Sequence, residues 1–272
     1  MEKSYLEYQK HIMFYQTFGK GDKTVFAFHG YGRDGNDFKI LGPALGEDYR
    51  IVSFDLLYHG MSDSPAYPEE FDFKKEDLRD LISFYLSENN IERFSLLAYS
   101  LGGRISLQLI ELFPDKIDTV FLFAPDGLHH SFGYNFSTKT SLGKFLFKRF
   151  IKSPYLAFLI MKLGKSTGLI KDSVYKFLIM QLDTKAKRQK VFDTHIFFRN
   201  IHPDLENVQH ILNTKNIKLH LFFGKYDTII PPRYGKEFMK GLNDKEALHI
   251  LESGHHLIKE SVNEVLKKLM KK

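Results

Sequence analysis

The sequence predicts an α/β fold with a mostly parallel, doubly wound sheet and helices on both faces. Short, nearly continuous apolar segments alternate with stretches in which apolar residues recur at helical spacing. A turn signal follows each apolar segment, which is typical of strands buried on both faces of a parallel sheet. The chain has 272 residues, of which 43% are hydrophobic, and this is enough for a large core.

The expected strands are, in chain order, residues 12–18, 24–28, 50–54, the segment that leads into Ser100, 119–124, 218–223 and 248–251. Helices are expected over residues 74–89, 103–113, 204–214, 233–241 and 257–270. In doubly wound sheets, ligands bind at the carboxyl ends of the strands. The polar motifs that follow these strands should therefore meet in space.

The stretch 128–202 breaks the alternation and differs in charge. It holds 14 Lys and Arg but 3 Asp and Glu, a net charge of +11, whereas the rest of the chain has 25 basic and 30 acidic residues, a net charge of −5. We interpret it as a helical cap, inserted after the fifth strand over the carboxyl edge of the sheet, and residues 1–127 and 203–272 as the core. Within the cap we expect helices separated by a break at Ser153-Pro154 and a loop at Gly164 and Gly168.

The composition excludes several kinds of chemistry. The chain has no cysteine and therefore no disulfide, thiol nucleophile or thiolate metal site. Histidines and carboxylates do not occur at metal-ligand spacing, and the glycine-rich turns lack the spacing of a phosphate or dinucleotide loop. We therefore expect no metal and no cofactor. The net charge of +6 comes without a nucleic-acid recognition motif, so no nucleic-acid partner is expected either.

The N-terminal residues are polar and lack the apolar region of a signal peptide. The apolar run from Tyr155 to Met161 is too short to cross a bilayer. On this basis we expect a cytoplasmic protein.

The segment from Phe94 to Arg104 has the pattern of a nucleophile elbow, in which a tight turn between a strand and a helix exposes one hydroxyl. Ser100 lies at the tip of the turn. Ala98, Gly102 and Gly103 around it are small, as the close approach of strand and helix requires. The alternative is that Ser100 is an ordinary helix N-cap.

Four further motifs follow strand ends, and the order Ser100, Asp227, His255 is the nucleophile, acid and base order of the α/β-hydrolase triad. With these residues, the chain resembles the α/β-hydrolase superfamily over nearly its whole length except the cap. The segments that carry the resemblance are His29-Gly30-Tyr31-Gly32, Asp55 to Ser62, Gly224 to Pro231 and Ser253-Gly254-His255-His256. In the second segment, Leu57-Tyr58 replaces the Pro-Gly that is usual in the family.

The resemblance implies a role for each residue. Ser100 would be the nucleophile, His255 its general base, and Asp227 the carboxylate that orients the imidazole. The backbone N–H groups of Leu101, at the start of a helix, and of Tyr31, by resemblance, would form the oxyanion hole.

The acid and the base each have a competitor in the sequence. Asp126 also follows a strand and competes with Asp227, which could instead be a turn residue. His256 competes with His255. The histidines at positions 29 and 59 adjoin glycines and are interpreted as structural hydrogen-bonding groups, and Asp55 as the anchor of its own loop.

The cap decides the substrate, and the sequence leaves three interpretations open. Its Phe-rich faces could simply pack, its basic amphipathic helices could contact an anionic lipid surface, or Arg149, Arg188 or Arg199 could hold an anionic substrate. Tyr99 and Arg104 are candidate substrate-binding residues, because the elbow is also similar to that of the menaquinone-pathway lyase that makes 2-succinyl-6-hydroxy-2,4-cyclohexadiene-1-carboxylate. In plain hydrolases, the arginine at this position only packs.

The sequence therefore favours a cofactor-independent serine hydrolase that cleaves an ester, thioester or related acyl bond of a small-molecule substrate through an acyl-enzyme. The alternatives are the lyase, which would use the same triad, and a binding protein without catalysis. The binding protein predicts a triad out of register, with Asp227 too far from His255 to form a hydrogen bond.

Overall fold

A computed structural model describes residues 2–8, 11–62, 68–70, 72–129 and 132–270 of the chain. Its centre is an eight-stranded, mostly parallel sheet, as the sequence predicts, with strand order β1-β2-β4-β3-β5-β6-β7-β8. The strands are β1 (Glu2–Tyr8), β2 (His11–Phe18), β3 (Lys23–Phe28), β4 (Tyr49–Phe54), β5 (Phe94–Tyr99), β6 (Ile117–Phe123), β7 (Lys218–Gly224) and β8 (Leu248–Leu251).

The strand β1 is absent from the sequence prediction. It pairs with β2 in antiparallel fashion, β2 pairs with β4 in the same way, and all other neighbours are parallel. Along β1, Leu6 is buried whereas Tyr5 is exposed. An edge strand with one solvated face alternates polar and apolar residues and lacks the continuous apolar run that marks the central strands.

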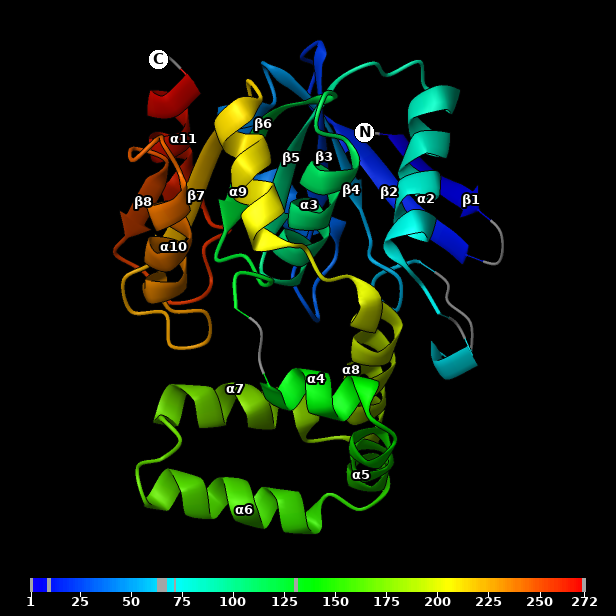
Figure 1. Ribbon diagram of the computed structural model, residues 1–272, viewed down its shortest axis with the longest axis vertical. Helices are drawn as coiled ribbons and strands as arrows, with labels where there is room; N and C mark the ends of the chain where they lie inside the picture. Colours follow the sequence, from blue (N-terminus) through cyan, green and yellow to red (C-terminus); the bar gives the residue numbers. More distant parts are fainter. Residues whose placement is uncertain (1, 9–10, 63–67, 71, 130–131, 271–272) are drawn as a thin grey trace. The chain divides into compact units, whose positions relative to one another are not determined.

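Helices pack on the sheet in groups. The helices α2 (Lys75–Glu88), α3 (Leu101–Leu112) and α9 (Leu205–Thr214) are neighbours along one face of the sheet (Figure 1), and α3 lies against β3 and β5. A second group pairs α1 (Gly42–Leu45), which follows the 3-10 turn η1 (Gly35–Leu41), with α11 (Asn263–Met270), which follows η5 (Glu260–Val262). The helix α10 (Pro232–Phe238), followed by η4 (Met239–Gly241), lies against β7 and β8.

An aromatic cluster supports the strand that leads into Ser100. Phe26 on β3 stacks on Phe94 of β5 with 4.7 Å between ring centroids, and Tyr85 of α2 packs edge-on against Phe26. All three rings are at most 1% exposed. Because buried aromatic pairs hold a close and specific geometry, this core gives β5 a rigid base.

The chain divides into two compact units: Met1–Pro65 with Lys75–His129 and Ile201–Lys272, and Ala66–Lys74 with His130–Asn200. The second unit contains η2 (Pro68–Glu70), α4 (Phe132–Lys139), α5 (Ser141–Lys152), α6 (Tyr155–Ser166), α7 (Asp172–Leu182), α8 (Lys185–Phe197) and η3 (Phe198–Asn200). The helix break falls at Ser153-Pro154 as expected. Gly164 was expected in a loop, but it lies inside α6, which continues to Ser166.

The second unit also includes a segment that the sequence places in the core, around Glu69 and Phe73. Phe73 stacks on Phe197 with 4.6 Å between centroids, and Lys148 forms an ion pair with Glu69. Asn200 Nδ2 donates to Asp72 Oδ1 at 2.8 Å. These contacts join residues far apart in the sequence, so no local sequence pattern predicts them. The placement of residues 128–202 as a lid over the sheet stays a prediction.

Inside the second unit, a small apolar core consists of Ile151, Phe192 and Ile196, with Phe147 and Phe150 packed against it. Among the described residues, no helix combines the length and the apolar character that crossing a bilayer requires.

Candidate active site

The turn between β5 and α3 holds Ser100 in a rare backbone conformation, with φ 51° and ψ −114°. The N–H of Ser100 donates to the Phe123 carbonyl of β6 at 3.0 Å, and its own carbonyl accepts from the N–H groups of Gly103 and Asp126. Ser100 makes no side-chain hydrogen bond that caps α3, so the N-cap alternative lacks its defining contact. The strained turn leaves the hydroxyl available for other partners.

The glycines of the elbow are required by close approach. A Cβ at Gly102 would overlap the carbonyl oxygen of Phe28, and one at Gly103 would overlap the ring of Pro125. The N–H of Gly102 donates to the His29 carbonyl at 3.0 Å, which ties the start of α3 to the loop after β3.

The structure brings Ser100, His255 and Asp227 together from three strand ends. His255 Nε2 lies 3.2 Å from Ser100 Oγ, and His255 Nδ1 lies 2.7 Å from Asp227 Oδ2. The Asp227 side chain has no exposed surface, and that of His255 is 13% exposed. The register that the binding-protein alternative requires, with Asp227 beyond hydrogen-bond reach of His255, is not found.

Asp227 combines the two interpretations that the sequence treated as rivals. Its Oδ1 accepts from the N–H groups of Ile229 and Ile230 at 2.8 and 3.0 Å, as a turn aspartate does, while Oδ2 faces His255. The turn therefore fixes the orientation of the carboxylate that the imidazole contacts.

The competing acid, Asp126, has other partners. Its Oδ2 accepts from Arg104 Nη2 at 2.5 Å, and its Oδ1 accepts from the N–H of Gly127. The Arg104 side chain is 9% exposed. This ion pair supports the packing role for Arg104 and gives no support to a role in binding a substrate carboxylate.

The loop after β3 lies beside the serine. A Cβ at Gly30 would come within 3.2 Å of Ser100 Cβ and would contact the Tyr99 ring, so only glycine fits there. Tyr31 follows in the same loop, and its ring packs edge-on against His59. At the other side of Ser100, Leu101 is the first residue of α3, where an N–H has no acceptor within the helix. These are the two N–H groups that the sequence predicts as oxyanion donors.

His29 is a structural hydrogen-bonding group. The Leu56 N–H donates to His29 Nε2 at 2.9 Å, so Nε2 is an acceptor and Nδ1 carries the proton that it donates to the Gly30 carbonyl at 2.8 Å. The His59 ring nitrogen Nδ1 lies 3.1 Å from the Leu57 carbonyl. Both rings thus brace the loops next to the site.

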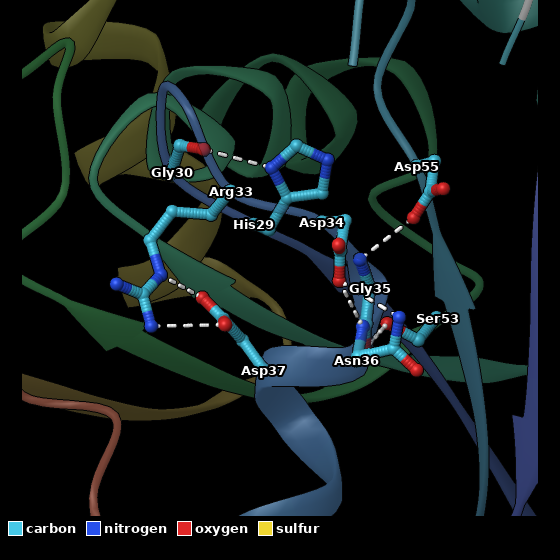
Figure 2. Close-up of polar contacts among 9 residues, drawn as sticks. All are labelled: His29, Gly30, Arg33, Asp34, Gly35, Asn36, Asp37, Ser53 and Asp55. Atoms are coloured by element: carbon cyan, nitrogen blue, oxygen red, sulfur yellow. Dashed lines mark hydrogen bonds and ion pairs between the residues drawn. The ribbon is translucent and has the colours of Figure 1, made fainter. Parts of the chain in front are cut away.

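Asp55 anchors the same region (Figure 2). Its Oδ1 accepts from the Gly35 N–H at 2.7 Å, as Figure 2 shows. Its Oδ2 accepts from the Met61 N–H at 2.8 Å. Ser53 Oγ donates to the Gly35 carbonyl (Figure 2). Both the N–H and the carbonyl of Gly35 are therefore hydrogen-bonded to side chains of β4 and the residue that follows it.

Sequence reasoning missed one pair in this loop. The guanidinium of Arg33 forms a two-pronged ion pair with Asp37 (Figure 2). Arg33 lies just before η1 and Asp37 lies within it, so the pair links the loop to the start of this turn.

The ring of Tyr99 packs against the imidazole of His255. Its ring centroid is 5.3 Å from that of His255, and the residue is 5% exposed. Burial raises the pKa of its phenol. The structure therefore shows Tyr99, a candidate substrate-binding residue, packed against the imidazole. Burial, with the Arg33 charge, lowers the pKa of the rival histidine, His256.

Of the three arginines that the sequence offers for an anionic substrate, Arg188 and Arg199 form hydrogen bonds within the second unit. Arg188 donates to the carbonyls of Ile151 and Leu182, and Arg199 to that of Ile196. Arg188 thus joins α5, α7 and α8. No group of metal-ligating side chains occurs among the residues that the structure describes.

Known proteins share this architecture. A family model described as the alpha/beta hydrolase fold matches residues 23–150. The chain is similar to the proline iminopeptidase PfmaB of Pestalotiopsis fici, with 25% identity over 261 residues, 90% of this chain and 88% of that protein. A thermophilic esterase from Thermogutta terrifontis aligns with a TM-score of 0.68 at 14% identity, over 100% of this chain and 97% of the esterase.

Another relative is the dihydrolipoyllysine-residue acetyltransferase component of the acetoin cleaving system of Pseudomonas putida. It is 27% identical over 117 residues, 43% of this chain and 30% of that protein, so the chain spans about a third of its length. Together with the sheet order and the elbow, these similarities show that the chain has the alpha/beta hydrolase fold.

Proposed function

We propose that the protein is a serine hydrolase that cleaves a carboxylic ester, thioester or related acyl bond without a cofactor. The observation that carries the proposal is the pair of short contacts from His255, at 3.2 Å to Ser100 Oγ and 2.7 Å to Asp227 Oδ2. A serine is a weak nucleophile unless a base within hydrogen-bond reach takes its proton.

In the first half of the reaction, Ser100 Oγ attacks the acyl carbon while its proton passes to His255 Nε2. Asp227 stabilises the resulting imidazolium and keeps the proton on Nδ1 facing its carboxylate. The backbone N–H groups of Tyr31 and Leu101 donate to the oxyanion. The bond to the leaving group then breaks, and His255 returns the proton to that group.

In the second half, a water molecule takes the place of the leaving group. His255 accepts a proton from this water, whose oxygen attacks the acyl carbon, and the acid departs as Ser100 regains its proton. The substrate is a small acyl compound. The same triad would serve the lyase alternative, but the pairing of Arg104 with Asp126 does not favour it.

The first test is labelling with a fluorophosphonate probe and turnover of short p-nitrophenyl esters. We expect Ser100→Ala to abolish labelling and to lower kcat by about 10⁶. Ser87→Ala, on the exposed side of α2, is the matched control and should behave as wild type. Labelling that persists in Ser100→Ala would refute the proposal.

A second test separates the two candidate acids. Asp227→Asn should lower kcat by about 10⁴, because the imidazole is no longer held in the correct tautomer. Asp126→Asn removes the negative charge that pairs with Arg104, and we expect less than about a tenfold change, because the side-chain oxygens of Asp126 accept from Arg104 and Gly127. Equal losses in both variants would contradict the assignment of the acid.

A further inference from the structure

The helix α6 is apolar, yet none of its residues is buried. Its exposed apolar side chains are spaced at i, i+1, i+4, i+5 and i+8, which places them on one side of the helix. They are Tyr155, Leu156, Leu159, Ile160 and Leu163. Leu156 is 65% exposed and Ile160 is 58% exposed.

The other side of α6 already has partners within its own unit. The Phe158 ring lies 6.1 Å, centroid to centroid, from the Phe150 ring of α5, and Gly164 faces the side chain of Ile170. The exposed stripe is therefore what remains after the helix has packed on its neighbours.

The helix α5 adds to this apolar surface. Leu142, Phe145 and Leu146 recur at helical spacing and are exposed, Phe145 to 64%. We call these three side chains, together with the five exposed apolar side chains of α6, the α5–α6 surface. Exposed apolar side chains that recur along one side of a helix, as those of α6 do, mark interaction sites.

Positive charges accompany the apolar residues. Neither α5 nor α6 contains an acidic residue, and their basic residues are Lys144, Lys148, Arg149, Lys152, Lys162 and Lys165. Lys148 and Lys165 form ion pairs with Glu69 and Asp172. Within the described part of the chain, no ion pair involves Arg149, Lys152 or Lys162.

An apolar stripe flanked by cations on helices too short to cross a bilayer is the pattern of a helix that lies in the plane of an anionic membrane surface. A second copy that docked through the same surface is a poorer partner, because its own 128–202 stretch would bring a further net charge of +11 against the first. We propose that the α5–α6 surface docks on an anionic lipid bilayer, with the stripe of α6 in the headgroup region. This docking does not depend on the chemistry at Ser100.

The test uses the full chain and vesicles of phosphatidylcholine with or without phosphatidylglycerol. The chain has no tryptophan, so Ile160→Trp on α6 and Phe84→Trp on α2 each introduce a single reporter at an exposed apolar position. We expect the Ile160→Trp emission to shift to the blue with the anionic vesicles only, and the Phe84→Trp emission to stay unchanged.

Two double variants separate the apolar and the charged contributions in vesicle co-sedimentation. Leu156→Gln with Ile160→Gln should weaken binding about a hundredfold, since two apolar side chains that would enter the bilayer are lost. Lys152→Gln with Lys162→Gln should weaken it about tenfold, and the charge-matched control Lys267→Gln with Lys268→Gln on α11 should change it little. Circular dichroism checks that each variant is folded.

Three outcomes would overturn the proposal. One is the absence of binding to anionic vesicles. Another is equal binding by the α6 variants and their controls. The third is blue-shifted emission from Ile160→Trp without vesicles, which would mean that protein covers the helix; loss of that shift on dilution would identify a second copy as the cover.

Discussion

The helices α3 and α6 are both 12 residues long and both apolar, but their surroundings are opposite. In α3 the ten residues from Leu101 to Ile110 are buried, whereas in α6 no residue is. The difference lies in how closely the backbone can approach its neighbours. Gly102 and Gly103 let α3 meet the Phe28 carbonyl and the Pro125 ring, whereas α6 meets its unit through the larger side chain of Phe158.

Strained backbone conformations also differ between the unit that holds α3 and the unit that holds α6. Non-glycine residues with positive φ occur at Tyr58, Asn90, Ser100 and Ala124, all in the unit that holds the sheet. Among the described residues of the other unit, the positive φ values are confined to Gly168. A dense core can hold a residue in an unfavourable conformation, because many contacts oppose its relaxation.

The largest effect expected from this comparison is at the glycines. Gly102→Ala should destabilise the protein by about 4 kcal/mol or more and abolish ester turnover, since its Cβ would overlap a backbone carbonyl. Gly164→Ala, whose Cβ would meet the flexible end of Ile170 at 2.8 Å, should change the free energy of unfolding by less than about 1 kcal/mol. Urea unfolding measures both, and similar losses would refute the contrast.

Truncation of leucines should give a smaller difference in the same direction. Leu107→Ala on α3 removes a side chain with no exposed surface and should cost about 2–5 kcal/mol. Leu159→Ala on α6, where the side chain is 41% exposed, should cost less than about 0.5 kcal/mol. A comparable cost at Leu159 would show that α6 is buried in solution.

Acid should act on the sheet before it acts on the helical unit. Burial, followed by the neighbouring His249 and Lys218, lowers the pKa of His220 to about 4 from 6.5. As the pH falls below 6.5, the unfolded chain binds the proton first, so stability declines until about pH 4 and then levels off.

The His220→Phe variant should lose less stability over this range, by about 1–2 kcal/mol after allowance for partial solvent access. In the helical unit, hydrogen bonds from Lys165 and Lys176 lower the pKa of the exposed Asp172 to about 2, from 3.8. Its contribution is therefore retained down to pH 3.8. Thermal unfolding across pH tests this, and parallel pH profiles for wild type and His220→Phe would contradict it.

The smallest expected effect concerns strain. Tyr58, with φ 67°, replaces the glycine that is usual in this turn of the family, and Tyr58→Gly should raise stability by about 0.5 kcal/mol. Gly168→Ala, at φ 76°, should lower it by about 1 kcal/mol. Differential scanning calorimetry can resolve both, and a lower Tm for Tyr58→Gly would mean that the contacts of its side chain outweigh the strain.

Much of the sheet and the candidate site could be predicted from the sequence. The central strands are continuous apolar runs, and the motifs around Ser100, Asp227 and His255 follow strand ends, where a parallel sheet brings polar groups together. The strand β1 was missed because its residues, Glu2–Tyr8, are mostly polar and include no continuous apolar run. The segment around Glu69 and Phe73 was missed because its partners lie far away in the chain.

The sequence by itself determined the order of the strands from β2 to β8, the position of the elbow, and the set of residues that could act there, because these depend on local periodicity and turn chemistry. Only the tertiary structure decided that Asp227 and not Asp126 faces His255, that Arg104 pairs with an aspartate, and that α3 is buried while α6 is not. Those outcomes depend on which side chains meet across large separations in the chain, and a linear pattern of apolar and polar residues does not contain that information.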